Sequence, residues 1–248
     1  MHKKEFFRSK FVFVVLLTFL IHHDLLCQSL GIGGGASLSH LSMEETDEAY
    51  QSVGGLSAQI FYVLDLTESC AFRFELSYHS KGNRYESESS QDYQINNQAV
   101  NLSSLISIKT RLNYIDYKPL FVYQKSINQK SSIYGCFGPY VGIGIYGHRS
   151  INQRYTSSHQ GFIPEANSMN TEEISFGSSG SGFDYLDFGF SSIAGYTYQS
   201  FYAELSYDFG LNNIDSFNNS DSRLMNRFFS VKVGYLIRFN KNKKTNRT

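Results

Sequence analysis

Charged side chains recur at even spacing within three segments of the chain, and this spacing places them on one face of an extended strand. The residues between them are mostly apolar or aromatic and take the opposite face. Both signs of charge are present, and buried charges require partners. We therefore expect a structural network of ion pairs on the inward face of the strands. Its six predicted members are Arg73, Glu75, Glu204, Asp208, Lys232 and Arg238.

The residue types that enzymes use do not gather into a recognisable site. His148 and His159 fall in or near the longest connection, among many serines, whereas a serine hydrolase needs a serine, a histidine and an acid in contact. Serine is so common here that nearness in sequence carries little information. No cluster has metal-ligand spacing, and His79 is expected to be a polar filler on the inward face. We expect no catalytic residue, no metal site and no cofactor.

A glycine-rich stretch at residues 31–35 resembles a phosphate-binding loop only superficially. It lacks the strand-then-helix setting and the lysine of a P-loop. Glycines within a strand also mark a place where other groups approach the backbone closely. We expect this stretch to let a strand pass close to side chains that fill the interior.

The charged segments alternate between apolar and polar residues with the period of two that is typical of β-strands. In 229–239, for example, Phe229, Val231 and Val233 share one face, while Ser230 and Lys232 share the other. Eight segments read in this way: 30–40, 53–66, 70–82, 104–124, 136–146, 185–198, 201–211 and 229–239.

Two of these segments add detail to the inward face. Segment 185–198 places Asp187 there. Segment 104–124 alternates only in part. Its apolar residues lie mainly at even-numbered positions, so Lys109 and Arg111, at odd-numbered positions, would face inward. The apolar residues at even-numbered positions are Ile106, Ile108, Leu112, Tyr114, Leu120 and Val122.

The connections between these segments alternate between long and short. We expect them near 42–52, 67–69, 83–103, 125–132, 148–183, 199–200 and 212–226. Antiparallel neighbours would collect the short turns at one end and the long loops at the other, as in outer-membrane barrels with short periplasmic turns and long extracellular loops. The prediction is an all-β, transmembrane, antiparallel up-and-down β-barrel of about eight strands. The alternative is a soluble β-sandwich or lipocalin-like barrel, whose apolar face would point inward.

The N-terminus has the form of an export signal. A basic stretch at 2–10 precedes the apolar run Phe11–Ile21, which is too short to cross a bilayer as a helix and fits a cleaved signal peptide. We expect residues 1–27 to be the signal peptide, 28–239 the barrel and 240–248 a basic periplasmic tail. A lipoprotein would acylate Cys27, but the residue before it is not small. Cys70 and Cys136 fall on non-neighbouring strands and are expected to be free thiols.

Three stretches resemble the PorT-like group of outer-membrane-protein β-barrel domains of Gram-negative bacteria. Phe74–Gly82 is similar to its Glu-Leu-x-Tyr-x-x-Lys-Gly strand end, and Gly138–Gly142 to its Gly-Pro-Tyr-x-Gly segment. Tyr114–Leu120 is similar to a Tyr-Leu-Glu-x-Pro-Leu strand with one extra residue before the proline, which suggests a bulge or a shifted register. The resemblance covers about residues 30–239 and implies a location in the outer membrane. It says little about activity, although some members are implicated in protein secretion.

The predicted interior decides between a filled barrel and a channel. Eight strands leave room only for the barrel's own side chains, and a lining of both charges favours a paired network over a pore. We expect a non-enzymatic structural or interaction scaffold in the cell outer membrane. The alternatives are a narrow porin-like transport protein and a component of a protein-secretion system.

The expected partners are the lipid of the outer membrane and a protein bound at the extracellular loops. The chain carries 22 Lys and Arg against 22 Asp and Glu, with no large basic face, so nucleic acid is not an expected partner. The sequence leaves the oligomeric state open.

Overall fold

The computed structural model describes residues 28–43, 50–95, 98–157, 166–174, 176–177, 182–214 and 224–239. The expected signal peptide, the basic tail, Cys27 and His159 lie outside these ranges. Among the described residues, no helix is long and apolar enough to cross a bilayer. The strands are β1 (Gln28–Met43), β2 (Tyr50–Asp65), β3 (Cys70–Ile95), β4 (Gln98–Ser126), β5 (Ser131–Ser157), β6 (Ala166–Ile174), β7 (Leu186–Tyr198), β8 (Phe201–Gly210) and β9 (Leu224–Phe239).

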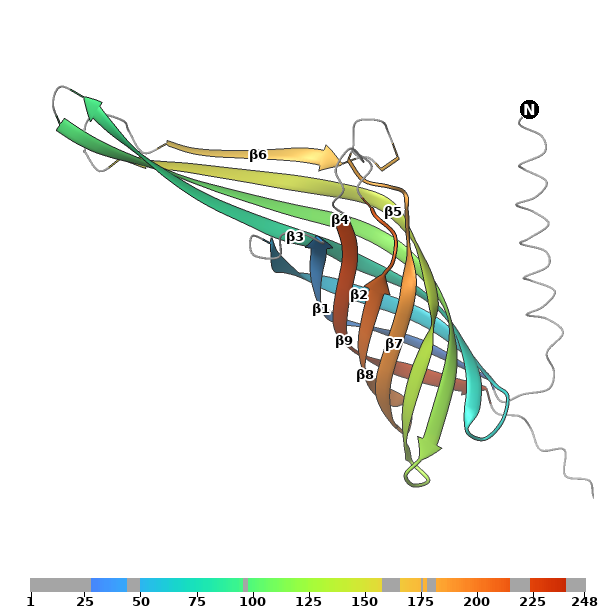
Figure 1. Cartoon of the computed structure of the whole chain (residues 1–248). Helices are drawn as coiled ribbons and strands as arrows, with labels where there is room; N and C mark the ends of the chain where they lie inside the picture. Colours follow the sequence, from blue (N-terminus) through green and yellow to red (C-terminus); the bar gives the residue numbers. More distant parts are fainter. Residues whose placement is uncertain are drawn as a thin grey trace, which may run out of the picture.

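Eight of these strands close into an up-and-down barrel (Figure 1). Each pairs with its neighbours in antiparallel fashion, and the pairing of β1 with β9 and of β4 with β5 closes the ring. The inner half of β5 pairs with β7, while its outer half pairs with β6, which is an additional strand outside the ring. The predicted all-β barrel of about eight strands is confirmed.

The apolar face of the strands points outward and the polar face points inward. On β9, Val233 is 61 % exposed and Phe229 is 39 % exposed, whereas Lys232 and Ser230 between them are fully buried. Strand β8 alternates in the same way along its whole length. A soluble β-sandwich or lipocalin-like barrel would bury the apolar face, so the outward apolar belt identifies lipid as the surrounding medium.

Strand β4 corrects one part of the predicted pattern. Leu112, Tyr114 and Leu120 are buried in the lumen, while the outward face carries other apolar residues, such as Ile115 and Phe121. Both faces of β4 are partly apolar because its inward residues also form small hydrophobic clusters inside the barrel. Hydrophobic alternation therefore assigned this strand the wrong orientation, and it placed Lys109 and Arg111 on the wrong face as well.

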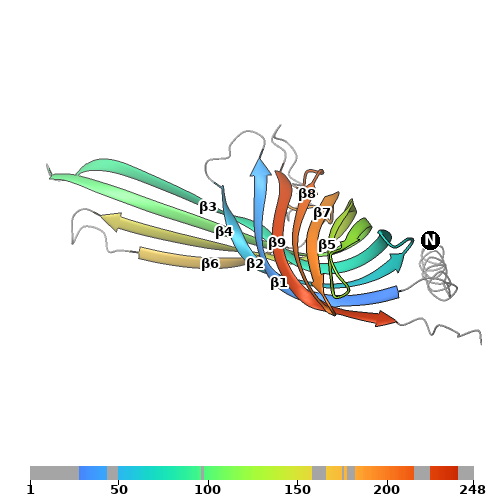
Figure 2. The ribbon, with the colours of Figure 1, turned by 90° about the horizontal axis from the view of Figure 1, so that it is seen from below.

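Two of the expected long loops are largely strand. The segment 83–103 continues β3 and β4, which remain paired from Cys70–Tyr123 as far as Ile95–Gln98. Within 148–183, β5 extends to Ser157 and β6 pairs with it. Together β3, β4, β5 and β6 form a twisted sheet that projects from the barrel (Figures 1 and 2). Polar residues on both faces suggested loops, but hairpin pairing satisfies the backbone of a strand whatever its side chains are.

The short connections fall at the opposite end, as predicted. They join β2 to β3, β4 to β5 and β7 to β8, and both termini of the barrel lie at this end because Gln28 pairs with Phe239. In outer-membrane barrels the short turns face the periplasm. The projecting sheet therefore stands on the extracellular side.

Candidate functional site in the barrel lumen

A four-residue ion-pair cluster occupies the lower part of the lumen, on the periplasmic side. Arg73 contacts both Glu75 and Glu204, with its Nη1 atom 2.9 Å from Oε2 of Glu204. The Nζ atom of Lys232 lies 3.2 Å from Glu204 and 3.5 Å from Glu75. Gln59 and Tyr134 donate hydrogen bonds of 2.6 and 2.9 Å to Glu204. The carboxylate of Glu204, on β8, thereby joins residues of β2, β3, β5 and β9.

A second group of charges continues the network toward the extracellular end. Lys118 Nζ lies 2.6 Å from Asp208 Oδ2. Further up, Lys81 lies between Asp116, at 2.9 Å, and Asp187, at 2.8 Å. These contacts join residues on β3, β4, β7 and β8, so the network crosses the lumen rather than following one pair of strands.

The network contains five of the six residues predicted from the sequence. Glu204 and Lys232 face each other in the register of β8 and β9. Asp208 instead pairs with Lys118 on the far side of the lumen. Arg238 is outside the network: it is exposed and lies at the mouth of a cavity, because β9 extends past the filled section of the barrel.

Sequence reasoning missed three charged members of the network, Lys81, Asp116 and Lys118. Lys81 lies at the end of segment 70–82, where the neighbouring positions Ser80 and Gly82 are not apolar and the alternation is lost. The other two lie on β4, whose orientation was misjudged. The sequence signal for Asp116 and Lys118 is their spacing of two residues, which places both charges on one face of an extended strand. The charges of Lys109 and Arg111 lie on the opposite face.

Burial of these charges is close to complete. Each of the nine is at most 2 % exposed, and four cations stand against five carboxylates. Charges out of contact with water are tolerated when they are paired and hydrogen-bonded. The nine are Arg73, Glu75, Lys81, Asp116, Lys118, Asp187, Glu204, Asp208 and Lys232.

One set of potential metal ligands occurs within this network. Side-chain atoms of His79, Asp116 and Asp208 lie within 4.8 Å of one another, a grouping that sequence spacing did not reveal because the three come from different strands. Both carboxylates already contact ammonium groups, of Lys81 and Lys118. Two fixed cations beside the same oxygens oppose the binding of a metal cation, so the residues present do not fit a metal site.

An apolar cluster covers the extracellular end of the network. It includes Tyr114, whose ring meets that of Phe176 at a centroid distance of 5.4 Å. The cluster combines residues of the barrel wall with residues from the end of β6 and from the connections after β6 and β8. Its members are Leu41, Leu112, Tyr114, Ile174, Phe176, Phe183, Ile214 and Leu224.

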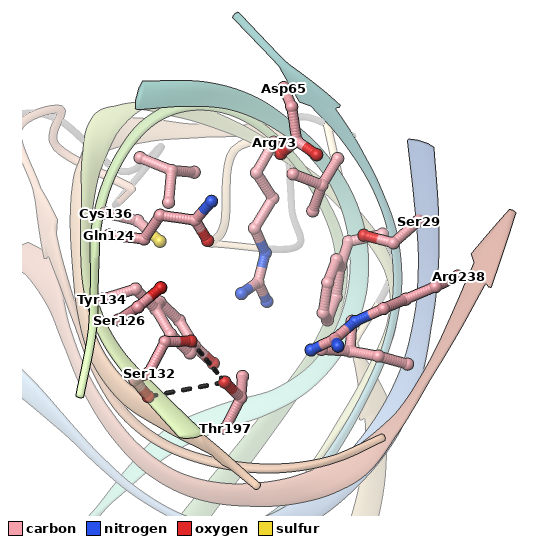
Figure 3. A pocket seen from close by; sticks show the side chains of 14 residues that line it. Ser29, Asp65, Arg73, Gln124, Ser126, Ser132, Tyr134, Cys136, Thr197 and Arg238 are labelled. Carbon is pink, nitrogen blue, oxygen red and sulfur yellow. Dashed lines mark hydrogen bonds between the residues drawn. The ribbon is translucent and has the colours of Figure 1, made fainter. Parts of the chain in front are cut away.

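A cavity of about 290 Å³ opens at the periplasmic end. Arg73 points into it from the network, and Arg238 reaches over it from β9 (Figure 3). The ring of Phe61 lies against the guanidinium of Arg73, with 3.5 Å from Cζ to the ring centroid. Hydroxyl groups, including those of Ser132 and Thr197, line the rim. Arg73 therefore belongs both to the lining of this cavity and to the buried ion-pair cluster.

Comparison with known proteins agrees with this architecture. A family model described as "Outer membrane protein beta-barrel domain" matches residues 28–216. The chain belongs to this family. The match places the protein in the outer membrane and carries no information on the PorT-like group. No curated protein matches the sequence.

Several solved structures match this chain at low identity. Ail, the attachment invasion locus protein of Yersinia pestis, is 13 % identical, with a TM-score of 0.35 over 86 % of this chain and all of that one. Neisserial surface protein A is also 13 % identical, with a TM-score of 0.33 over 85 % of this chain and 97 % of that one. An outer membrane channel from Pseudomonas putida F1 is 9 % identical, with a TM-score of 0.26 over 87 % and 96 %. These similarities are too distant to bear on function.

Proposed function

We propose that this outer-membrane barrel is a non-enzymatic scaffold that holds its projecting β-sheet at the cell surface. The observation that carries the proposal is the filled lumen, in which nine paired charges lie between an apolar cluster and the periplasmic cavity. A barrel filled in this way supplies a rigid anchor and no path for solutes.

The energetics of the network favour a permanent closure. Opening a channel would separate Lys118 from Asp208, or Arg73 from Glu204, and leave charges without partners. Breaking a buried pair costs about 3–5 kcal/mol, and several pairs would have to break together. A pore that opens at rest would instead need a lining that is hydrated and of one dominant sign.

The projecting sheet supplies the surface for a partner. Strands β3 and β4 run far beyond the barrel as one hairpin, and β6 adds an outer strand whose Met169 is 76 % exposed. The outer edge of β6 has no paired strand among the described residues. Such edges bind extended segments of other proteins by adding a strand to the sheet. The proposed partner is therefore a protein bound on this sheet, as a secretion component would also require.

Conductance of the purified protein in planar lipid bilayers tests the sealed lumen. The wild-type protein is expected to give no steady current steps. The double variant Arg73→Ser with Glu204→Ser leaves only the Lys232–Glu75 contact of the four-residue cluster. It is expected to conduct more readily, whereas Val233→Ala on the lipid face is not. Regular ion-selective steps from the wild type would contradict the scaffold and favour a narrow porin-like transporter.

A separate measurement addresses the absence of catalysis. A fluorophosphonate probe, which reacts with activated serines, is expected to leave the folded protein unlabelled. Labelling that depends on the folded state, and that a single serine substitution abolishes, would show a nucleophile that the scaffold proposal lacks.

A further inference from the structure

A groove of about 780 Å³ lies on the outer wall of the barrel, where the projecting sheet leaves it. The groove forms because the pairing of β2 with β3 is interrupted between Ser52 and Ser57. Gly54 and Gly55 lie in this interruption and line the groove. It is distinct from the lumen and takes no part in the scaffold function proposed above.

One wall of the groove is apolar and continuous with the lipid-facing belt. Leu56 is 73 % exposed, Leu38 is 54 % exposed, and Val231 is 46 % exposed. Leu38 pairs with Phe229 across β1 and β9, at the extracellular end of the apolar face of β9. This wall therefore stands where the outer leaflet of the bilayer meets the protein.

The other wall is polar and fixed by hydrogen bonds. The hydroxyl of Tyr78 donates to Asn113 Oδ1 at 2.7 Å, and it lies 3.3 Å from the hydroxyl of Tyr146. Arg111 and His148 are opposite each other in the register of β4 and β5, and both line the groove. The Nε atom of Arg111 is buried and has no hydrogen-bond partner among the described residues.

The surroundings of Arg111 are basic on the side of the projecting sheet. Lys109 is two residues away on the same face of β4 and pairs with Arg84 of β3. Partial burial lowers the pKa of Lys109, and the positive charges of Arg111 and Arg84 lower it further. Two acids are near: Glu86 lies 3.8 Å from Arg84, and Glu173 of β6 is opposite His148. A bound anion would relieve the repulsion among the three cations.

We propose that this groove binds a phosphate-bearing lipid of the outer leaflet, with its phosphate at Arg111 and His148 and its acyl chains along Leu38 and Leu56. A free anion would make no use of the apolar wall, and a neutral apolar molecule would leave the arginine donor unpaired. An anionic amphiphile matches both walls at once. Arginine binds phosphate oxygens through strong charge-assisted hydrogen bonds.

Binding of lipid A, a phosphorylated glycolipid, to the folded protein in dodecyl maltoside micelles tests the proposal. Arg111→Gln should weaken binding roughly tenfold or more, as expected for the loss of one charge-assisted bond. Leu56→Ser on the apolar wall should weaken it as well. Arg154→Gln, on the same face of β5 but outside the groove, should leave it unchanged. Heat-modifiable migration on gels shows that each variant is folded.

Two further binding measurements distinguish a lipid phosphate from a free phosphate ion. Inorganic phosphate in large excess should not displace lipid A, and dephosphorylated lipid A should bind as weakly as lipid A binds to Arg111→Gln. Displacement by inorganic phosphate would reduce the site to a simple anion site and overturn the lipid proposal. Equal loss in Arg111→Gln and Arg154→Gln would also overturn it, since binding would then reflect overall charge.

Discussion

Lys118 Nζ lies 2.6 Å from Asp208 Oδ2, although β4 and β8 are not neighbours in the barrel. The contact therefore bridges the lumen. Ser191 of β7 donates a hydrogen bond of 2.6 Å to the other oxygen of Asp208, and neither member of the ion pair is more than 1 % exposed. A bridge of this kind shows that side chains of strands that are not neighbours can meet across the barrel interior.

Removal of one member of this bridge should destabilise the barrel strongly. Lys118→Met leaves Asp208 buried without its cation, and an uncompensated buried charge costs about 3–5 kcal/mol. The double variant Lys118→Met with Asp208→Leu removes both charges and should recover most of the lost stability. Urea-induced unfolding in lipid vesicles measures the stability of both variants. It is followed by circular dichroism, because the chain has no tryptophan for fluorescence. Additive losses in the double variant would show that the two residues do not act as a pair.

The outward belt predicts a dependence on depth in the bilayer. Val233 is near the middle of the apolar face of β9 and is 61 % exposed, so Val233→Arg should cost about 2–4 kcal/mol of folding free energy in vesicles. Phe239→Arg, at the end of the same face, should carry a much smaller charge penalty, because an arginine near the membrane interface costs only about 0–1 kcal/mol. Alanine variants at both positions correct for the lost side chains. An equal charge penalty at the two positions would contradict a lipid-facing belt.

The glycine-rich part of β1 should be intolerant of side chains that point inward. A Cβ atom at Gly33 would lie 2.2 Å from the hydroxyl of Tyr202 and 2.6 Å from the carbonyl oxygen of Val233. Gly33→Ala should therefore destabilise the barrel by about 1–3 kcal/mol through overpacking. Gly135→Ala on β5 is a matched control, because its nearest atom would be 3.9 Å away. Equal stability of the two variants would contradict the close approach of Tyr202 to β1.

The sequence predicted the strands whose two faces differ most in polarity. On β8 and β9 the outward face is continuously apolar, while Glu204, Ser206, Ser230 and Lys232 point inward, so alternation predicted the orientation of both strands. On β4 this contrast is lost, since Leu112 and Leu120 fill the lumen while Ile115 faces lipid. Contacts across the lumen, such as Lys118 with Asp208, depend on barrel diameter and stagger. Those quantities are not encoded in any single segment.

The projecting sheet was missed for a related reason. Residues 83–103 are rich in Ser, Asn, Gln and acidic side chains and have no apolar face, so periodicity gave no signal for a strand. Their order comes from the ladder between β3 and β4, which begins in the barrel and continues outward. The polar composition of residues 83–103 therefore indicates exposure to water. It does not indicate that secondary structure is absent.

Of the two cysteines among the described residues, Cys136 lines the periplasmic cavity and Cys70 does not. Neither forms a disulfide, as predicted; Cys70 is partly exposed at the start of β3, and Cys136 is 5 % exposed at the cavity wall. A bulky polyethylene-glycol maleimide should label Cys70 in the folded barrel and reach Cys136 only after unfolding. A small methylating thiol reagent should enter the cavity and modify Cys136 in the folded state, although more slowly than Cys70. The single variants Cys70→Ser and Cys136→Ser assign each signal, and rapid labelling of Cys136 by the bulky reagent would show that the lumen is far more open than its ion pairs imply.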